Sequence, residues 1–303
     1  MTLRPDTATP PVVTPASETR PHTMSPSGEA LRMFMRNPSA VVGLIVLTLV
    51  SLATLFGPYL YTTDPFDMFL IPFTEPFSDS EAPLGSDHMG RDILAQILVG
   101  GSATLSVGLL AALITVVIGV LVGALSGYFG GYVDELLMRV TEFFQVLPQL
   151  VFAMVLVSLF SPSLLTITLA IGIVSWPTTA RLARAEFLRI RQLDYIKASR
   201  SLGAGNAYLI FRVILPNATP PLVVSATMAI GTAILFEAGL SFLGLGDPNV
   251  VSWGMMIGQG RTFLHDVWWT VTIPGLMIFL TVLAVSMIGD GLNDAFNPRL
   301  RER

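Results

Sequence analysis

The fold is decided by residues 105–128, LSVGLLAALITVVIGVLVGALSGY, which contain no charged side chain. This run is longer than the about 20 apolar residues that an α-helix needs to cross about 30 Å of hydrocarbon. The whole chain has 303 residues, of which 52% are hydrophobic and 13% charged. Soluble domains usually carry about 25% charged residues. We therefore expect lipid to be the main solvent of this protein.

Five further apolar runs lie along the chain. They are residues 40–61, 140–160, 163–180, 219–245 and 267–289. None shows the period-two alternation of a membrane β-strand. Pro162, between the third and fourth of the six runs, suits a tight turn because proline cannot continue a helix. Trp253, Trp268 and Trp269, near the ends of the last two runs, are expected to anchor them at the membrane surface. The pattern predicts an all-α polytopic membrane protein with six transmembrane helices.

The segments between the runs differ strongly in charge. Residues 62–100 contain seven acidic residues and one basic residue, whereas residues 181–216 contain seven basic residues and two acidic ones. Both chain ends also carry arginines. Since Lys and Arg are enriched in cytoplasmic loops, we expect both termini and residues 181–216 to be cytoplasmic. Residues 62–100 are then an acidic periplasmic loop.

The two ends of the chain are short segments outside the predicted spans. Residues 1–30 are rich in Pro, Thr and Ser, and we predict that they form a disordered cytoplasmic tail. Residues 31–61 are predicted to hold an amphipathic segment and the first transmembrane helix. Residues 291–303 are predicted to be a cytoplasmic C-terminus.

The composition argues against several kinds of site. The chain has no cysteine, only three histidines and a net charge of −4, which disfavours disulfides, multi-histidine metal sites and nucleic-acid binding. Asp87, His88 and Asp92 are close in sequence, but a lone histidine among carboxylates is usually only solvated, so we expect no metal ion there. Instead, Arg91 is expected to pair with the neighbouring aspartates and to order the loop.

The chain carries no complete catalytic motif. It has no Gly-x4-Gly-Lys-Ser/Thr phosphate loop, so we expect it to have no ATPase site of its own. Gly239-x-Ser241 imitates part of a serine-hydrolase motif, but no histidine lies within a predicted span to act as the base. We therefore expect a protein that is not an enzyme and that needs no cofactor of its own.

The basic loop 181–216 contains small residues and a proline at regular distances. Ala198-Ser199 is followed after three residues by Gly203, and after nine more by Val213-Ile214-Leu215-Pro216. By itself, such a loop is compatible with a solvated basic segment that only fixes the topology. The spacing resembles the EAA loop of ABC-importer permeases, whose pattern is Glu-Ala-Ala, three residues, Gly, nine residues, then Ile-x-Leu-Pro. Lys197, Ser199 and Val213 stand where this pattern has Glu, the second Ala and Ile.

Further motifs lie along about residues 31–303. They are LGSD (84–87) with GRD (90–92), GYFGG (127–131), LSFLGLG (240–246), SWG (252–254) and GDGL (289–292). Together they resemble the permease subunit, of the DppC/OppC type, of dipeptide/oligopeptide/nickel ABC importers. The resemblance implies the type I ABC-importer permease fold, with residues 101–290 as the transmembrane domain. It also implies the bacterial inner (cytoplasmic) membrane as the location.

The same resemblance implies partners and a division of labour. Such a subunit forms half of the translocation pathway, and a second homologous permease forms the other half. Two cytoplasmic ATPase subunits bind the ATP, and an external substrate-binding protein delivers di- or oligopeptides, with nickel or glutathione as the alternative cargo. Residues 198–203 would form a helix that docks on an ATPase. The residues implied in this coupling are Lys197, Ala198, Ser199, Gly203, Val213, Leu215 and Pro216.

Two features lie inside predicted spans. Glu237 interrupts residues 219–245, where it either lines the pathway and binds a peptide amine or is protonated or paired in a structural role. Gly119, Gly123 and Gly127 lie on one face of their span and permit close packing of a helix from this chain or from another.

A secondary, ion-coupled transporter is the alternative function. Carriers of that class bind their coupling ions through intramembrane acids or broken helices, often in inverted repeats. This chain has one acidic residue in the middle of a span and no evident repeat. That model also gives no role to the basic loop 181–216, and we therefore favour the ABC permease.

Overall fold

The structure is a computed structural model that describes residues 26–296. Most of the predicted tail 1–30, and part of the predicted C-terminal segment 291–303, lie outside the described residues. The described part consists of helices and loops and contains no strand beyond isolated bridges. Its elements in chain order are α1 (Pro26–Arg36), α2 (Pro38–Leu60), α3 (Ile93–Phe129), α4 (Gly131–Val146), α5 (Gln149–Leu159), α6 (Leu164–Arg191), α7 (Asp194–Ser201), α8 (Asn206–Tyr208), the π-helix η1 (Leu209–Ile214), α9 (Leu215–Phe242), α10 (Trp253–Gly260), the 3-10 helix η2 (Arg261–Phe263) and α11 (Trp269–Phe296).

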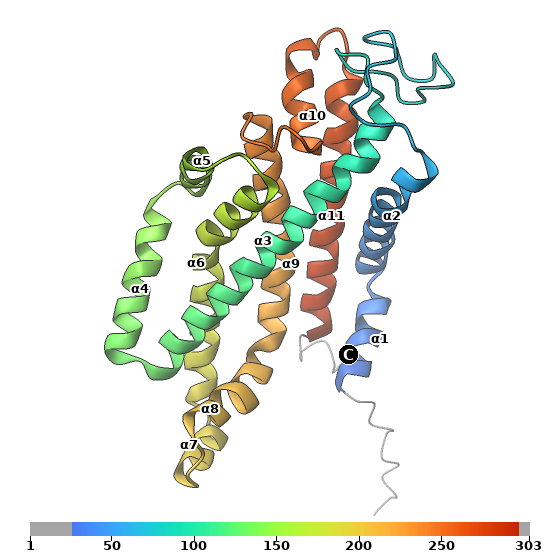
Figure 1. Ribbon diagram of the computed structural model, residues 1–303. Helices are drawn as coiled ribbons and strands as arrows, with labels where there is room; N and C mark the ends of the chain where they lie inside the picture. The colour runs from blue at the N-terminus through green and yellow to red at the C-terminus, as the bar shows by residue number, and fades with distance from the viewer. Residues whose placement is uncertain (1–25, 297–303) are drawn as a thin grey trace, which may run out of the picture.

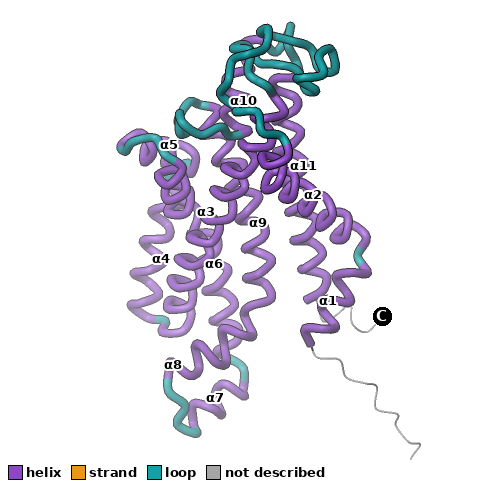
Figure 2. Tube along the Cα trace, turned by 45° about the vertical axis from the view of Figure 1, so that its right-hand side comes forward, coloured by secondary structure: helices purple, strands orange, loops and turns teal. Residues whose placement is uncertain are grey.

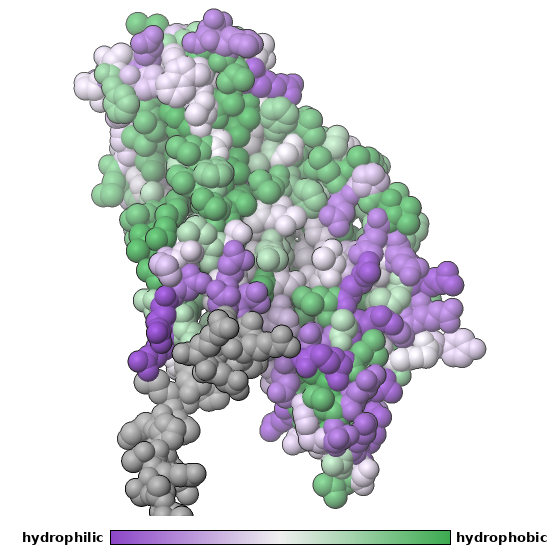
Figure 3. Space-filling model, turned by 180° about the vertical axis from the view of Figure 1, so that it is seen from behind, coloured by the Kyte–Doolittle hydropathy of each residue, from purple (hydrophilic) through white to green (hydrophobic). Residues whose placement is uncertain are grey.

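The described part contains five helices that are long and apolar enough to cross a membrane, or six if the bent pair α4–α5 counts as one span. The prediction of an all-α chain is therefore confirmed for the described part, and the number of spans in it is five or six. α3 packs along α6, and α11 packs against both α2 and α9. Figure 3 shows apolar surface over the middle of one face and hydrophilic residues gathered towards its ends, as a membrane protein requires.

The molecule has two distinct ends (Figures 1 and 2). One end carries residues 61–92, which we call the cap, together with α10. The opposite end carries α7 and α8, and α1 and the end of α11 lie towards it as well. There, Asn37 Nδ2 donates to Asp294 Oδ2 at 2.9 Å and joins the start of α2 to the end of α11. The first and last described residues and the basic loop thus share one end.

The third predicted span is not one helix. α4 and α5 are bent by 88° at a short break that contains Leu147 and Pro148. Leu147 is extended, with φ −80° and ψ 134°, because a following proline disfavours the helical conformation of the residue before it. Pro148 itself has no N–H with which to continue α4. The apolar run over residues 140–160 therefore corresponds to two helices that meet at a sharp bend next to Pro148.

Two helices extend beyond their apolar runs. α3 begins at Ile93, well before residue 105, because Asp92 Oδ1 accepts from Leu94 N at 2.6 Å and from Ala95 N at 3.2 Å, which caps the helix. The loop predicted over residues 62–100 consequently ends at Asp92. α6 continues to Arg191, so the first part of the basic loop 181–216 is helical. Apolar runs mark the part of a helix buried in lipid, whereas polar caps determine where the helix ends.

The fifth span is entered without a break. α8, η1 and α9 form one helical course from Asn206 to Phe242. Pro216 lies inside that course. A proline removes one helical hydrogen bond and crowds the carbonyl four residues before it, and we attribute the wider π-turns of η1 to this position.

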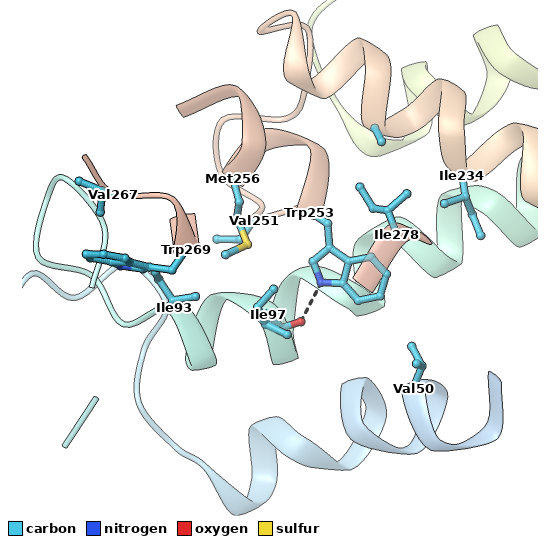
Figure 4. Packing of buried hydrophobic residues seen from close by; sticks show 11 residues of the cluster. Val50, Ile93, Ile97, Ile234, Val251, Trp253, Met256, Val267, Trp269 and Ile278 are labelled. Carbon is cyan, nitrogen blue, oxygen red and sulfur yellow. Dashed lines mark hydrogen bonds between the residues drawn. The ribbon is translucent and has the colours of Figure 1, made fainter. Parts of the chain in front are cut away.

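A buried cluster at the cap end joins α3, α9, α10 and α11 (Figure 4). Trp253 is fully buried in this cluster, and its Nε1–H donates to Ile97 O at 3.0 Å. Trp269 is also buried and donates to Ser86 O of the cap at 3.3 Å. The prediction that these two residues anchor the helices at the membrane surface is wrong. Of the three tryptophans predicted as anchors, Trp268 is the exposed one, at 55%.

The three glycines of the predicted ladder lie where α3 meets α6. A methyl group on Gly123 would stand 2.3 Å from Ala180 O. On Gly119 and Gly127, the nearest atoms of α6 would be only 2.6 Å and 2.7 Å away. The helix that these glycines contact therefore belongs to the same chain.

Candidate functional site

The helix of the basic loop, α7, ends in a defined turn at Gly203. Gly203 N–H donates to Arg200 O at 3.0 Å, and Ala204 N–H donates to Ser199 O at 3.1 Å. These are the two bonds of a Schellman motif. Gly203 has a φ of +88°, in the left-handed region that glycine adopts without a Cβ clash. α7 starts at Asp194, so the predicted coupling segment 198–203 covers only the second half of the helix and its stop.

α7 is linked to three long helices. Ile196 is its buried side chain and packs in a cluster with residues of α3, α6, η1 and α9. Tyr128, near the end of α3, adds polar contacts: its hydroxyl donates to Asn206 Oδ1 at 2.7 Å and accepts from Arg200 Nη2 at 3.1 Å. α7 is thus connected to α3, α6 and α9 through packed side chains and hydrogen bonds.

The residues predicted for coupling fall into two groups by burial. The exposed residues are Lys197, Ala198, Gly203 and Pro216, and the half-buried residues are Ser199, Val213 and Leu215. Val213 and Leu215 pack against the cluster that holds Ile196. The first part of the motif is therefore presented to the outside, while its second part fixes the loop to the start of α9.

Large apolar and aromatic side chains are exposed around α7. They are Tyr195 (46% exposed), Leu202 (89%), Tyr208 (54%) and Phe211 (61%). We call these residues, together with the exposed basic residues Lys197, Arg200 and Arg212, the α7 surface. Exposed apolar groups surrounded by polar ones mark interaction sites, and aromatic and arginine side chains are enriched in protein interfaces. The α7 surface therefore has the composition of a protein-docking site.

Glu237 is fully buried near the cap end of α9. Ser241 Oγ donates to its Oε1 at 2.8 Å, while Oε2 has no hydrogen-bond partner among the described residues. The hydroxyls of Thr104 and Ser252 lie next to the same carboxyl group. Glu237 is thus enclosed by hydroxyl-bearing residues of α3, α9 and the turn before α10. This environment fits the structural role better than direct contact with a substrate.

An ion pair between α4 and α6 was missed by the sequence reasoning. Arg184 Nε donates to Asp134 Oδ1 at 2.5 Å, and Arg184 Nη2 donates to Asp134 Oδ2 at 2.7 Å. Ser126 Oγ also donates to this carboxylate. The two residues are 50 positions apart, so no local spacing pairs them. The sequence offered one hint of this pair, which is that Asp134 and Arg184 both lie within a few residues of the end of an apolar run.

In the cap, Arg91 pairs with Asp87 as expected, but not with Asp92, whose carboxylate caps α3 instead. The side chain of Arg91 is 5% exposed, its Nε donates to Asp87 Oδ2 at 2.7 Å, and its Nη2 donates to Gln259 Oε1 of α10 at 2.5 Å. His88 stacks on the ring of Phe263 with centroids 5.5 Å apart. Among the described residues, no group of three His, Asp or Glu side chains is placed to hold a metal ion. The cap is therefore an internally bonded structure tied to α10.

Two protein-family models match this chain. The model described as "Binding-protein-dependent transport system inner membrane component" matches residues 119–302. The model described as "N-terminal TM domain of oligopeptide transport permease C" matches residues 25–79. The first match contains α7, η1 and the glycine ladder, whereas the second contains α1, α2 and most of the cap.

Curated relatives match over almost the whole length. The di/tripeptide transport system permease protein DppC of Pseudomonas aeruginosa is 38% identical over 293 residues, which cover 95% of this chain and 97% of the relative. The dipeptide transport system permease protein DppC of Escherichia coli K12 is 42% identical over 288 residues, which cover 93% and 96%. An inward facing structure of the MetNI methionine ABC transporter shares the fold. Its TM-score is 0.56 at 20% identity, with coverage of 64% of this chain and 93% of that one.

Proposed function

Because this chain belongs to the inner-membrane components of binding-protein-dependent transport systems, as a permease of the DppC type, we propose that it imports dipeptides as one of two permease subunits of an ATP-driven transporter. It is a multi-pass protein of the bacterial inner membrane. In this proposal, a second homologous permease supplies the other half of the pathway and an external binding protein delivers the peptide. Two ATPase subunits bind and hydrolyse the ATP, and this chain has no ATPase site of its own.

The proposed orientation places the α7 end in the cytoplasm and the cap in the periplasm. It is supported by the basic charge of residues 181–216 and the acidic charge of residues 62–100, since Lys and Arg favour the cytoplasmic side. The first and last described residues lie towards the same end as α7, as an even number of spans requires.

The observation that carries the proposed coupling is the α7 surface. Aromatic and basic side chains are exposed there on a helix whose one buried residue, Ile196, packs against α3, α6 and α9. Closure of the ATPases would push on α7, and the packed cluster would pass this movement to the long helices as a rigid-body shift. A loosely attached loop would absorb the same movement.

A single-cysteine cross-link tests this contact. The chain contains no cysteine, so Ala198→Cys, at an exposed position of α7, carries the only thiol of this subunit. In the assembled transporter in membranes, we expect a cross-link to an ATPase subunit whose yield changes when ATP binds. Ser78→Cys, at an exposed position of the cap, is the control and should give no such product. If an actively importing transporter gives no ATP-sensitive cross-link from Ala198→Cys, the coupling proposal is wrong.

Two neighbouring glycines offer a matched test of the turn. Gly203 has φ +88°, whereas Gly205 has φ −70°, and neither has an atom within 4 Å of the place where a Cβ would stand. A β-branched residue is strained only at the first of these conformations. We expect Gly203→Val to lower ATP-driven uptake of a labelled dipeptide at least about tenfold while the subunit remains inserted, and Gly205→Val to leave uptake near that of the parent. Equal uptake by the two variants would remove the argument from the turn.

A further inference from the structure

A cavity of about 160 Å³ lies between α3, α5, α6 and α9. Seven of the nine residues that line it carry a hydroxyl or a side-chain amide, and none carries a charge. Its polar lining includes Thr115 of α3, Gln149 of α5, Ser175 and Thr178 of α6, and Ser225 and Thr232 of α9. Those from α3, α6 and α9 lie within the apolar runs 105–128, 163–180 and 219–245, which places the cavity within the membrane.

The cavity contains a hydroxyl that the chain does not satisfy. Ser175 Oγ is buried and has no hydrogen-bond partner among the described residues. Buried polar groups in proteins are nearly always bonded to protein or to water, and the cavity is far larger than the about 10–15 Å³ that one water needs. The site is therefore wide and polar enough to hold water or a hydrogen-bonding ligand at membrane depth.

The open side of the cavity is also polar. Thr178 and Thr232 are exposed on the surface of this chain, at a depth where lipid would meet them if nothing else covered the face. Polar side chains inside a membrane usually face the protein interior or a water-filled path. On the same helix, Ile173 and Leu169 line a separate, apolar cavity between α5 and α6. α6 thus has one apolar face, which contact with lipid or with other helices explains, and one face of hydroxyl side chains, which such contacts do not explain.

The size of the cavity points to a shared site. Complete small-molecule sites occupy about 300–1,000 Å³, about two to six times the volume enclosed by this chain. A second permease across the open side would supply the missing wall. Glu237 is not among the residues that line this cavity.

We propose that this hydroxyl-lined cavity is this subunit's half of the translocation pathway, and that it binds the backbone amides of a peptide in transit. The proposal deepens the proposed function and rests on it. Each peptide group offers one donor and one acceptor, and serine, threonine and glutamine side chains both donate and accept. A neutral lining of this kind holds any peptide by its backbone, whatever its side chains. A fixed charge there would hold one terminus of the peptide and slow its release, whereas conduction requires weak binding.

Cysteine variants test whether the cavity is part of the pathway. The probe is a charged, water-soluble methanethiosulfonate reagent applied to the assembled transporter in proteoliposomes. We expect Thr178→Cys and Thr232→Cys to react at least about tenfold faster than the control Ile173→Cys. Modification should stop dipeptide import, and an imported dipeptide should slow the modification. Reaction as slow as that of Ile173→Cys, or full import after modification, would overturn the proposal.

Hydroxyl removal tests the recognition of the backbone. Thr178→Val combined with Thr232→Val keeps the shape of the lining but removes two hydroxyls. We expect import of several dipeptides, with acidic, basic and apolar side chains, to fall by a similar factor of about five or more. Thr168→Val is the control, since Thr168 lies on the same helix and its hydroxyl donates to Leu164 O outside the cavity. A loss confined to one class of dipeptide would refute backbone recognition.

The two proposals fail in distinguishable ways. If the unmodified complex imports no dipeptide in the presence of ATP, the proposed function is wrong whatever the cavity does. If it imports dipeptides normally and neither thiol modification nor hydroxyl removal changes the import, the function stands and the assignment of the cavity is wrong.

Discussion

Where the cap meets α3 it buries three charged residues, whereas its other five, Asp64, Asp67, Glu75, Asp79 and Glu81, and the charged residues of the α7 surface are exposed. In the cap, Asp87, Arg91 and Asp92 are 7%, 4% and 0% exposed, and each is bonded to neighbours within the chain. On α7, Lys197 and Asp194 form an ion pair whose side chains are 65% and 98% exposed. The Arg91–Asp87 pair of the cap is therefore shielded from water, whereas the Lys197–Asp194 pair of α7 is not.

This difference indicates that the two ends have different tasks. A buried ion pair is costly to break because one charge is left without a partner, so the cap has one stable arrangement. An exposed pair contributes little to stability, so the charges of the α7 surface are free to be rearranged by a binding partner. A rigid end and an end that is open to docking are what a subunit needs if it is driven from one side of the membrane.

The largest effect is expected from breaking the buried pair of the cap. Arg91→Met leaves the carboxylate of Asp87 buried without its cation, and loss of one partner of such a pair costs about 3–5 kcal/mol. The purified subunit in lipid nanodiscs should therefore unfold at a clearly lower temperature. The control is Arg139→Met, which breaks the exposed pair of Arg139 with Glu135 and should cost at most about 1 kcal/mol. Equal losses in the two variants would contradict the comparison.

The contact between α3 and α6, which connects the two ends, is expected to give the next largest effect. A methyl group at Gly123 meets Ala180 O at 2.3 Å, so Gly123→Ala must push the helices apart and should cost about 1–3 kcal/mol. At Gly231 of α9, the nearest atom would be 3.6 Å away, and Gly231→Ala should be neutral or slightly stabilising because alanine favours the helix. Thermal unfolding of the two variants measures the difference, and a tolerated Gly123→Ala would show that the helices can separate freely.

Most of the fold could be predicted from the sequence because lipid imposes a simple rule on apolar runs. Residues 105–128 lie within one continuous helix, α3, as predicted. The ends of the helices could not be predicted in the same way, since they depend on individual polar groups such as the Asp92 cap. The effect of a proline could not be predicted either, because Pro148 separates α4 from α5 whereas Pro177 and Pro274 lie within α6 and α11, so that the outcome depends on the surrounding packing.

The site could be predicted only in part. The spacing from Ala198 to Pro216 identified the loop that holds the exposed helix. This was possible because a sharp turn after a helix requires a residue with positive φ, which favours glycine at that position, and Gly203 does adopt φ +88°. The hydroxyl-lined cavity was missed because single threonines on α3, α6 and α9 are ordinary in each helix and gather only when the helices pack. Glu237 was predicted as a candidate pathway residue because it is an isolated acid within a span, but in the structure its side chain is fully buried.

A smaller effect is expected where α7 is attached to α3. Tyr128→Phe removes the hydroxyl that joins Asn206 and Arg200, and a net hydrogen bond contributes about 0.5–1.5 kcal/mol. Amide hydrogen exchange of residues 194–208 should become about fivefold faster, while exchange in the cap stays unchanged. Tyr132→Phe is the control, since Tyr132 is 92% exposed. Faster exchange at both ends would mean that Tyr128 stabilises the whole bundle and not the attachment of α7.

The smallest effect on stability at neutral pH is expected from a change at Tyr61, at the edge of the cap. The effect of this residue is seen in alkaline solution. Burial of Tyr61, together with its hydrogen bond to the carboxylate of Asp92, raises the pKa of Tyr61 from 10.0 to about 12. A raised pKa in the folded state means that this contribution to stability is complete below pH 10 and is lost as the pH rises through 12. An ultraviolet titration of tyrosinate should contain a component near pH 12 that disappears in Tyr61→Phe. If the variant instead lacks a component near pH 10, Tyr61 is open to water and this edge of the cap is as loosely held as the α7 surface.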